Sequence, residues 1–215
     1  MYFTRLVFLL LFSVIAVAIF FLRIYKIDGT SMNYGLVEGD IVLSVSYIDS
    51  IKRGDMLVIE HPLDLQNRLY LKRCAAIGGD RFFQKNRSFY LQIESNSTKT
   101  KEFALLYNLD IVKVKEGYFI KNPYRKYYGV VHDWSLIVPP PLRDIGITTL
   151  PPEHYYMLGD FRDNSADSRF FGAAPRSWVK SKVVYILKKS RDWLYLLHIK
   201  EVDDEAAREG NLFSR

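Results

Sequence analysis

The first pattern along the chain is an uncharged hydrophobic stretch of 17 residues, 6–22, between Arg5 and Arg23. At about 1.5 Å per residue, a helix of this length just reaches across the hydrocarbon core of a bilayer. The stretch therefore predicts a single N-terminal transmembrane helix after a tail of residues 1–5. Positive charges nearly balance on its two sides, so the sequence alone does not orient it.

A cleavable leader is the competing interpretation of the same stretch. Ala16-Val17-Ala18 has the small-x-small pattern that export processing favours. Cleavage there would leave an apolar start at Ile19 and would divide the span, so an uncleaved anchor is favoured. A secreted β-protein released after Ala18, in which Ser31 is only a surface residue, remains the other possibility.

After this stretch, short runs rich in β-formers alternate with glycine and aspartate, which favour turns. Gly-Asp pairs occur at residues 39–40, 54–55, 79–80 and 159–160. Helical periodicity is weak throughout. The predicted strands span residues 41–47, 56–59, 68–76, 89–93, 111–114, 118–120 and 183–187. The part after the anchor is therefore expected to be mostly β.

Residues 84–150 differ in amino-acid composition from the segments on either side of them. They are rich in Lys, Asn, Ser, Thr and Tyr, and proline clusters stand at 139–141 and 151–152. This predicts a smaller lobe inserted into a core made of residues 23–83 and 151–200. A charged C-terminal tail, 201–215, follows.

Composition narrows the function classes. A hydrophobic share of 49% with 15% aromatics predicts a packed core. The net charge of +6 comes from dispersed Lys and Arg, with little sign of a nucleic-acid site, and is equally explained by attraction to anionic lipid; charge therefore does not select a function. Cys74 is the only cysteine and the four histidines are scattered, so neither a disulfide nor a metal centre is predicted. No cofactor is expected.

Three segments carry candidate chemistry: Gly29-Thr30-Ser31-Met32, Tyr70-Leu71-Lys72-Arg73, and residues 159–172. Taken in this order, with the anchor and Arg53-Gly54-Asp55, they make the chain resemble the bacterial type I signal peptidases. The most specific match is Asp163-Asn-Ser-Ala-Asp-Ser-Arg169. The resemblance implies an antiparallel β catalytic core and a membrane-bound serine endopeptidase. The inserted lobe, which is expected to be β-rich, lies outside the segments that carry the resemblance.

In that family the nucleophile and base are a serine and a lysine, which correspond here to Ser31 and Lys72. A lysine acts as general base only when neutral. Its pKa must therefore fall by about 3 units from about 10.4 to be half neutral at pH 7, and burial can supply this shift. The weakly polar and apolar neighbours of Lys72 permit such burial.

The resemblance also implies a supporting group around this dyad. Arg73, Asp167 and Arg169 would form an ion-pair cluster under the site, and Ser165 would hydrogen-bond the Lys72 amine. Three further charged residues either satisfy their own turn or act directly: Asp160, Arg162 and Asp163.

The loop around Ser31 departs from the family pattern. The Ser31 backbone N–H would be one donor to the oxyanion, but the family's hydroxyl two residues earlier is absent because Gly29 stands there. The second donor would be backbone or the Thr30 hydroxyl. Asn33-Tyr34-Gly35 replaces the usual x-Pro-Thr, so either another contact holds the loop or activity is lower. Met32 either contacts substrate or fills the core.

The distance from membrane to nucleophile fits this function. Only eight residues separate Leu22 from Ser31, so an extended linker spans at most about 32 Å and keeps the nucleophile near the bilayer. By resemblance, the substrates are exported preproteins cut after an A-x-A-like site, at the outer face of the bacterial cytoplasmic membrane. The partners would be signal peptides and membrane lipids, with no nucleic acid, and the protein would be monomeric. A non-catalytic paralogue that binds signal peptides or lipid is the alternative.

Overall fold

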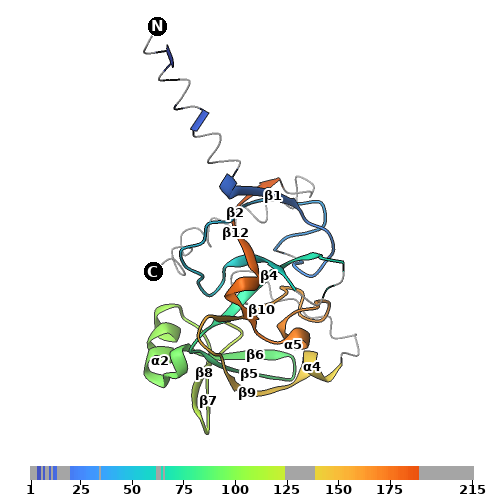
Figure 1. The fold of residues 1–215 in the computed structure, drawn as a ribbon. Helices are drawn as coiled ribbons and strands as arrows, with labels where there is room; N and C mark the ends of the chain where they lie inside the picture. Colours follow the sequence, from blue (N-terminus) through green and yellow to red (C-terminus); the bar gives the residue numbers. More distant parts are fainter. Residues whose placement is uncertain are drawn as a thin grey trace, which may run out of the picture.

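The computed structural model describes residues 20–33, 35–61, 66–123 and 139–188, and in addition residues 4, 5, 7, 10, 12, 13 and 64. The described strands form two antiparallel sheets (Figure 1). The larger sheet has the order β1-β2-β12-β3-β4-β10-β11, and the smaller has the order β7-β8-β6-β5-β9. The expected mostly antiparallel β architecture is confirmed.

The larger sheet draws its strands from both ends of the described chain. It contains β1 (Leu22–Lys26), β2 (Ile41–Val45), β3 (Met56–Glu60), β4 (Leu69–Ile77), β10 (His154–Leu158), β11 (Ala174–Pro175) and β12 (Val179–Lys188). The smaller sheet contains β5 (Arg81–Lys85), β6 (Ser88–Gln92), β7 (Ile111–Val114), β8 (Gly117–Lys121) and β9 (Ile145–Thr149). The described helices are η1 (Ile93–Ser95), α2 (Ser97–Leu106), α4 (Pro140–Arg143), α5 (Ser168–Phe171) and η2 (Arg176–Trp178).

All seven predicted strands lie on observed strands, with ends displaced by a few residues. Five observed strands were not predicted, namely β1, β5, β9, β10 and β11. Helix α2 was also not predicted. The smaller sheet begins at β5, so it starts a few residues before the predicted lobe at residue 84.

The two sheets share one hydrophobic cluster. Ala76 and Tyr156 of the larger sheet pack in it with Phe82 and Phe89 of the smaller sheet. The rings of Phe82 and Tyr156 have centroids 4.1 Å apart. Because aromatic side chains bury large areas, this contact holds the smaller sheet against the core.

Three of the four Gly-Asp pairs form the same turn. The glycine has φ of 89° at Gly39, 90° at Gly54 and 92° at Gly79, a region that favours glycine. Each following aspartate accepts the backbone N–H of the residue three positions earlier and donates its own N–H to that residue's carbonyl. The pairs are Asp40 with Val37, Asp55 with Lys52, and Asp80 with Ile77.

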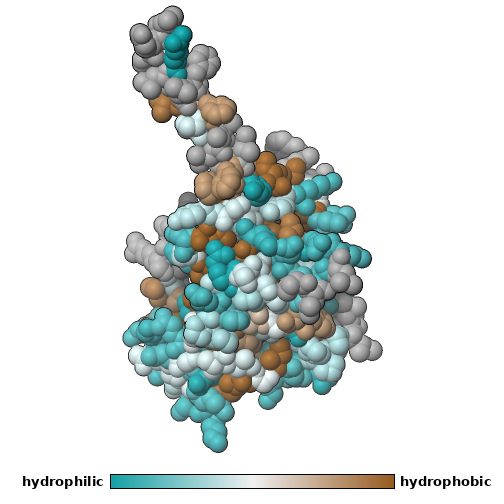
Figure 2. Space-filling view, viewed as in Figure 1, coloured by the Kyte–Doolittle hydropathy of each residue, from teal (hydrophilic) through white to brown (hydrophobic). Residues whose placement is uncertain are grey.

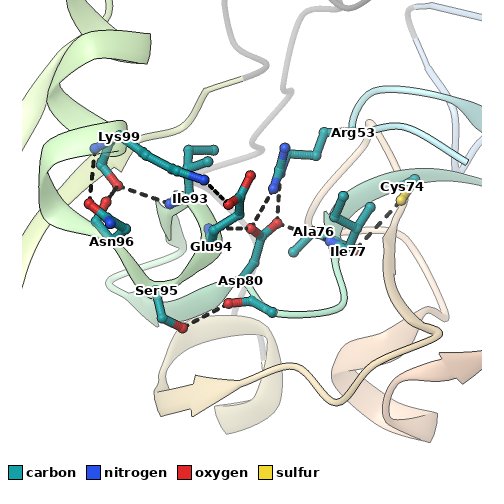
Figure 3. A network of polar contacts seen from close by, with 12 residues as sticks. Arg53, Cys74, Ala76, Ile77, Asp80, Ile93, Glu94, Ser95, Asn96 and Lys99 are labelled. Atoms are coloured by element: carbon teal, nitrogen blue, oxygen red, sulfur yellow. Dashed lines mark hydrogen bonds and ion pairs between the residues drawn. The ribbon is translucent and has the colours of Figure 1, made fainter.

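Asp80 also joins the two sheets (Figure 3). Its carboxylate accepts from Arg53 Nε at 2.7 Å and Nη2 at 2.6 Å. It also accepts the backbone N–H of Glu94 in η1 at 2.8 Å. Ser95 Oγ donates to the Gly79 carbonyl at 2.7 Å. A fully buried carboxylate with these donors fixes where the chain crosses from β4 into the smaller sheet.

The predicted transmembrane helix falls largely outside the described residues. Its last residue, Leu22, begins β1 and belongs to a strand. Within the described part of the chain, no helix is long and apolar enough to cross a membrane. The described residues before β1 are helical and project from the body (Figure 1), and Phe12 and Phe20 among them are 72% and 69% exposed. Figure 2 shows apolar surface where this segment meets the body. Residues 189–215, including the predicted tail, lie outside the described residues.

Candidate active site

Ser31 and Lys72 meet although 41 positions separate them. Ser31 lies in the turn between β1 and β2, whereas Lys72 lies within β4 opposite Leu57 of β3. Lys72 Nζ is 2.8 Å from Ser31 Oγ and donates to the Leu71 carbonyl at 3.0 Å. A protonated amine donates across the first contact, and a neutral amine can accept the hydroxyl proton instead.

The surroundings of Lys72 favour its neutral form. The residue is 3% exposed. Burial lowers the pKa of its amine to about 8, while Asp167 and Asp160 oppose this and Arg169 adds to it. With that pKa, about a tenth of the amine is neutral at pH 7. The site thus pairs a hydroxyl with an amine that can take its proton near neutral pH.

Arg73 forms a buried ion pair with Asp160. Its Nε and Nη2 donate to the two carboxylate oxygens at 2.8 and 2.7 Å, and its Nη1 donates to the Gly54 carbonyl at 2.7 Å. Successive side chains of a strand point to opposite faces, which lets Lys72 face the cleft while Arg73 faces the core. The pair ties β4 to the turn at residues 159–160.

Asp167 pairs with Arg169 and not with Arg73. Arg169 Nε and Nη2 donate to Asp167 at 2.8 and 2.7 Å, and both side chains are fully buried. Asp167 also accepts the Gly159 N–H at 3.0 Å. The expected single cluster is therefore two separate ion pairs. The reason is local: Asp167 caps the short helix α5, which keeps its carboxylate on its own segment.

Ser165 differs from its expected place. Its Oγ is buried and has no hydrogen-bond partner among the described residues, and it makes no hydrogen bond with Lys72. It packs against Gly159 instead. A β-carbon at Gly159 would lie 2.2 Å from Ser165 Oγ and 2.6 Å from the Ser31 carbonyl oxygen. Only glycine fits this close approach, which brings the two loops of the site together.

Residues 159–164 also hold the Ser31 loop directly. The Phe161 N–H donates to the Ser31 carbonyl at 3.0 Å. Asn164 Nδ2 donates to Thr30 Oγ1 at 2.8 Å. The Ser31 N–H has no acceptor within the part of the chain that the structure describes. It is therefore available to a ligand in the cleft.

The dyad opens into a cleft of about 330 Å³. Its apolar lining includes Ile27, Met32, Val42, Val58 and Leu71. Met32 is 2% exposed and also packs in the core cluster with Ile27 and Val42, so it both fills the core and reaches the cleft. Thr30, Asn164 and Ala166 line the cleft as well. Around a β-carbon built on Gly29 the space is open.

Two features lie apart from this chemistry. No group of His, Cys, Asp or Glu among the described residues could hold a metal ion. Cys74 is fully buried in the core, where burial raises the pKa of its thiol.

Known proteins share this sequence pattern. A family model described as signal peptidase, peptidase S26, matches residues 1–188. The chain belongs to this family. The signal peptidase I of Aquifex aeolicus is 27% identical over 207 residues, covering 83% of this chain and 80% of that protein. The signal peptidase I of Bacillus amyloliquefaciens is 29% identical over 148 residues, covering 67% of this chain and 64% of that protein.

A solved structure is also similar in part. The crystal structure of a signal peptidase I from Enterococcus faecalis matches with a TM-score of 0.34 and 17% identity, covering 64% of this chain and all of that chain. The family match and the relatives from Aquifex aeolicus and Bacillus amyloliquefaciens make the chain a signal peptidase enzyme, and the resemblance seen in the sequence is confirmed.

Proposed function

We propose that this enzyme removes N-terminal signal peptides from exported preproteins, with Ser31 as nucleophile and Lys72 as general base. The observation that carries the proposal is the 2.8 Å contact between Ser31 Oγ and the buried Lys72 amine at the edge of an open cleft. No second candidate base contacts Ser31 among the described residues.

The chemistry follows from this contact. Ser31 Oγ bonds to the carbonyl carbon of the scissile peptide while its proton passes to Lys72 Nζ, and the carbonyl oxygen becomes an oxyanion. When the C–N bond breaks, Lys72 returns that proton to the leaving amine. Water then attacks the acyl-enzyme, giving one proton to Lys72, and Ser31 regains a proton as the ester bond breaks.

The oxyanion requires donors close to where its charge develops. The Ser31 N–H is one, because no described residue accepts it. The Thr30 hydroxyl is the second, because Gly29 has no side chain and Thr30 lines the cleft. Two buried ion pairs hold β4 and residues 159–172 in position beside the dyad, namely Arg73 with Asp160 and Arg169 with Asp167.

The lining of the cleft favours substrates that have small side chains just before the cleaved bond. Met32 and Leu71 border the dyad in a space of about 330 Å³, which accommodates a few short side chains beside a backbone. Substrates with alanine at the first and third positions before the cut match this lining, and Met32 would contact them.

A membrane setting is supported by exposed apolar side chains at one end of the molecule. Phe20, Ile24 of β1 and Tyr185 of β12 are each at least 64% exposed, and Ile24 and Tyr185 share the partner Leu43 on β2. Such side chains enter the lipid interface favourably. We propose that the enzyme is a monomer in the bacterial cytoplasmic membrane, anchored by the hydrophobic stretch before β1, residues 6–21, with its catalytic part on the outer face.

The test is cleavage of a purified preprotein with an A-x-A site, in lipid vesicles that contain the enzyme. The wild type should cut after the second alanine, as determined by N-terminal sequencing of the product. A substrate with phenylalanine at that alanine should resist. Ser31→Ala should bind the preprotein without cutting it. Binding without cleavage by the wild type would instead identify a non-catalytic paralogue.

A further inference from the structure

The loop that carries Ser31 lacks the proline and threonine expected after Met32, yet two contacts hold it from residues 159–164. The Phe161 N–H binds the Ser31 carbonyl at 3.0 Å, and the Asn164 side chain binds the Thr30 hydroxyl at 2.8 Å. Asn164 itself is exposed, but its neighbours Asp163 and Ser165 are buried. The backbone that presents the Asn164 amide is therefore fixed.

The direction of the second contact determines where the Thr30 proton lies. Asn164 Nδ2 is an amide nitrogen that can donate hydrogen bonds but not accept them, so in this contact Thr30 Oγ1 is the acceptor. The hydroxyl proton of Thr30 must then point away from Asn164. Thr30, Ser31 and Asn164 all line the same cleft. The asparagine thus leaves Thr30 as a hydroxyl donor beside the Ser31 N–H.

We propose that Asn164 is a positioning residue that directs the Thr30 hydroxyl to the oxyanion, replacing the side-chain donor that Gly29 cannot supply. This inference rests on the proposed function. The bond is exposed in the free enzyme. A substrate that covers the cleft excludes water from it and strengthens both the bond and the donor it directs.

Exposure also makes the proposal testable. An exposed side-chain hydrogen bond contributes little to stability, so variants at Thr30 and Asn164 should fold as the wild type does. Asn164→Asp nearly keeps the shape of the side chain but reverses the bond, because a carboxylate accepts the Thr30 proton and removes it from the cleft. Thr30→Val removes the hydroxyl, and Thr30→Ser keeps it.

The experiment measures kcat and KM for preprotein cleavage across pH 6 to 10. Thr30→Val should lower kcat by about a hundredfold with little change in KM, as the loss of one oxyanion donor does. Thr30→Ser should retain most of the activity. Asn164→Asp should lower kcat about as much as Thr30→Val, and Asn164→Ala should lower it less. In a Thr30→Val background, Asn164→Asp should add no further loss.

Asn164→Asp also brings a negative charge toward Lys72, which could raise the pKa of the amine. Measuring kcat across the pH range distinguishes this charge effect from the proposed loss of the Thr30 donor. A pure charge effect moves the midpoint of the pH profile upward and restores kcat on the alkaline plateau, which would overturn the proposal. A lowered plateau supports it. Wild-type kcat in Thr30→Val would also overturn it while leaving the Ser31 and Lys72 chemistry intact. A wild type that cuts no preprotein would overturn both.

Discussion

Replacing Lys72 by methionine should abolish cleavage and yet stabilise the fold. The structure buries the amine and lowers its pKa from 10.5 to about 8. That difference corresponds to about 3 kcal/mol by which burial of the charged form destabilises the folded state at pH 7. Methionine has a similar length and no charge. Loss of the hydrogen bond to Ser31 destabilises the variant by about 1 kcal/mol. The net increase in the free energy of unfolding is therefore about 2 kcal/mol.

The sign of the pH dependence identifies the cause. The folded state has the lower pKa, so between pH 8 and 10.5 the unfolded chain binds more protons at Lys72, and wild-type stability rises with pH relative to Lys72→Met. The advantage of the variant is full below pH 8 and is lost by about pH 10.5. Urea unfolding in detergent, followed by tryptophan fluorescence at several pH values, measures it. Lys113→Met, at an exposed strand residue, controls for removal of a positive charge. A Lys72→Met variant that is less stable than wild type at pH 7, or a difference that does not change with pH, would refute this reasoning.

Three further outcomes are expected. The kcat/KM of the wild type should fall tenfold per pH unit well below pH 8, because protonation of Lys72 removes the base; a flat profile down to pH 5 would exclude a lysine base. Asp160→Asn should lower the free energy of unfolding by about 3 kcal/mol because it removes the carboxylate charge that Arg73 faces in this buried ion pair; a loss below 1 kcal/mol in urea unfolding would mean that the pair is unimportant. Gly159→Ala should reduce both stability and kcat, since the new methyl would collide with Ser165; wild-type values for both would show that the loop yields easily.

Two of the strands that the sequence predicts correctly, β2 and β3, share a simple feature. Residues 41–45 and 56–60 are runs of β-branched and aliphatic residues next to a glycine turn. Strand β10, which the sequence does not predict, lacks this feature. In β10, His-Tyr-Tyr-Met-Leu follows a proline cluster that suggests a loop, and its strand state comes from pairing with β4.

Helix α2 was missed for a related reason. Its sequence, STKTKEFALL, has almost no amphipathic pattern. Its start is determined by Asn96, whose side chain accepts the N–H groups of Thr98 and Lys99. An asparagine followed by serine and threonine is equally typical of a loop, so the sequence alone does not distinguish the two.

For the dyad and its supporting residues, the sequence predicts which residues form the site but not how they pair. The motifs indicate which residues gather at the site, and the structure brings Ser31 and Lys72 to hydrogen-bonding distance. The motifs do not indicate which carboxylate pairs with which cation, because Arg73 and Asp160 are 87 positions apart. That partner is determined by the close approach of residues 159–164 to β4.

The central claim is that Ser31 and Lys72 act as one catalytic unit. Its most direct test is the kcat for preprotein cleavage of Ser31→Ala, Lys72→Ala and the double variant, each purified in detergent and checked for folding. Groups that act together lose activity together, so all three should fall by the same factor, at least about a thousandfold. A single variant that keeps activity within tenfold of wild type, or a double variant far below both single variants, would contradict the claim.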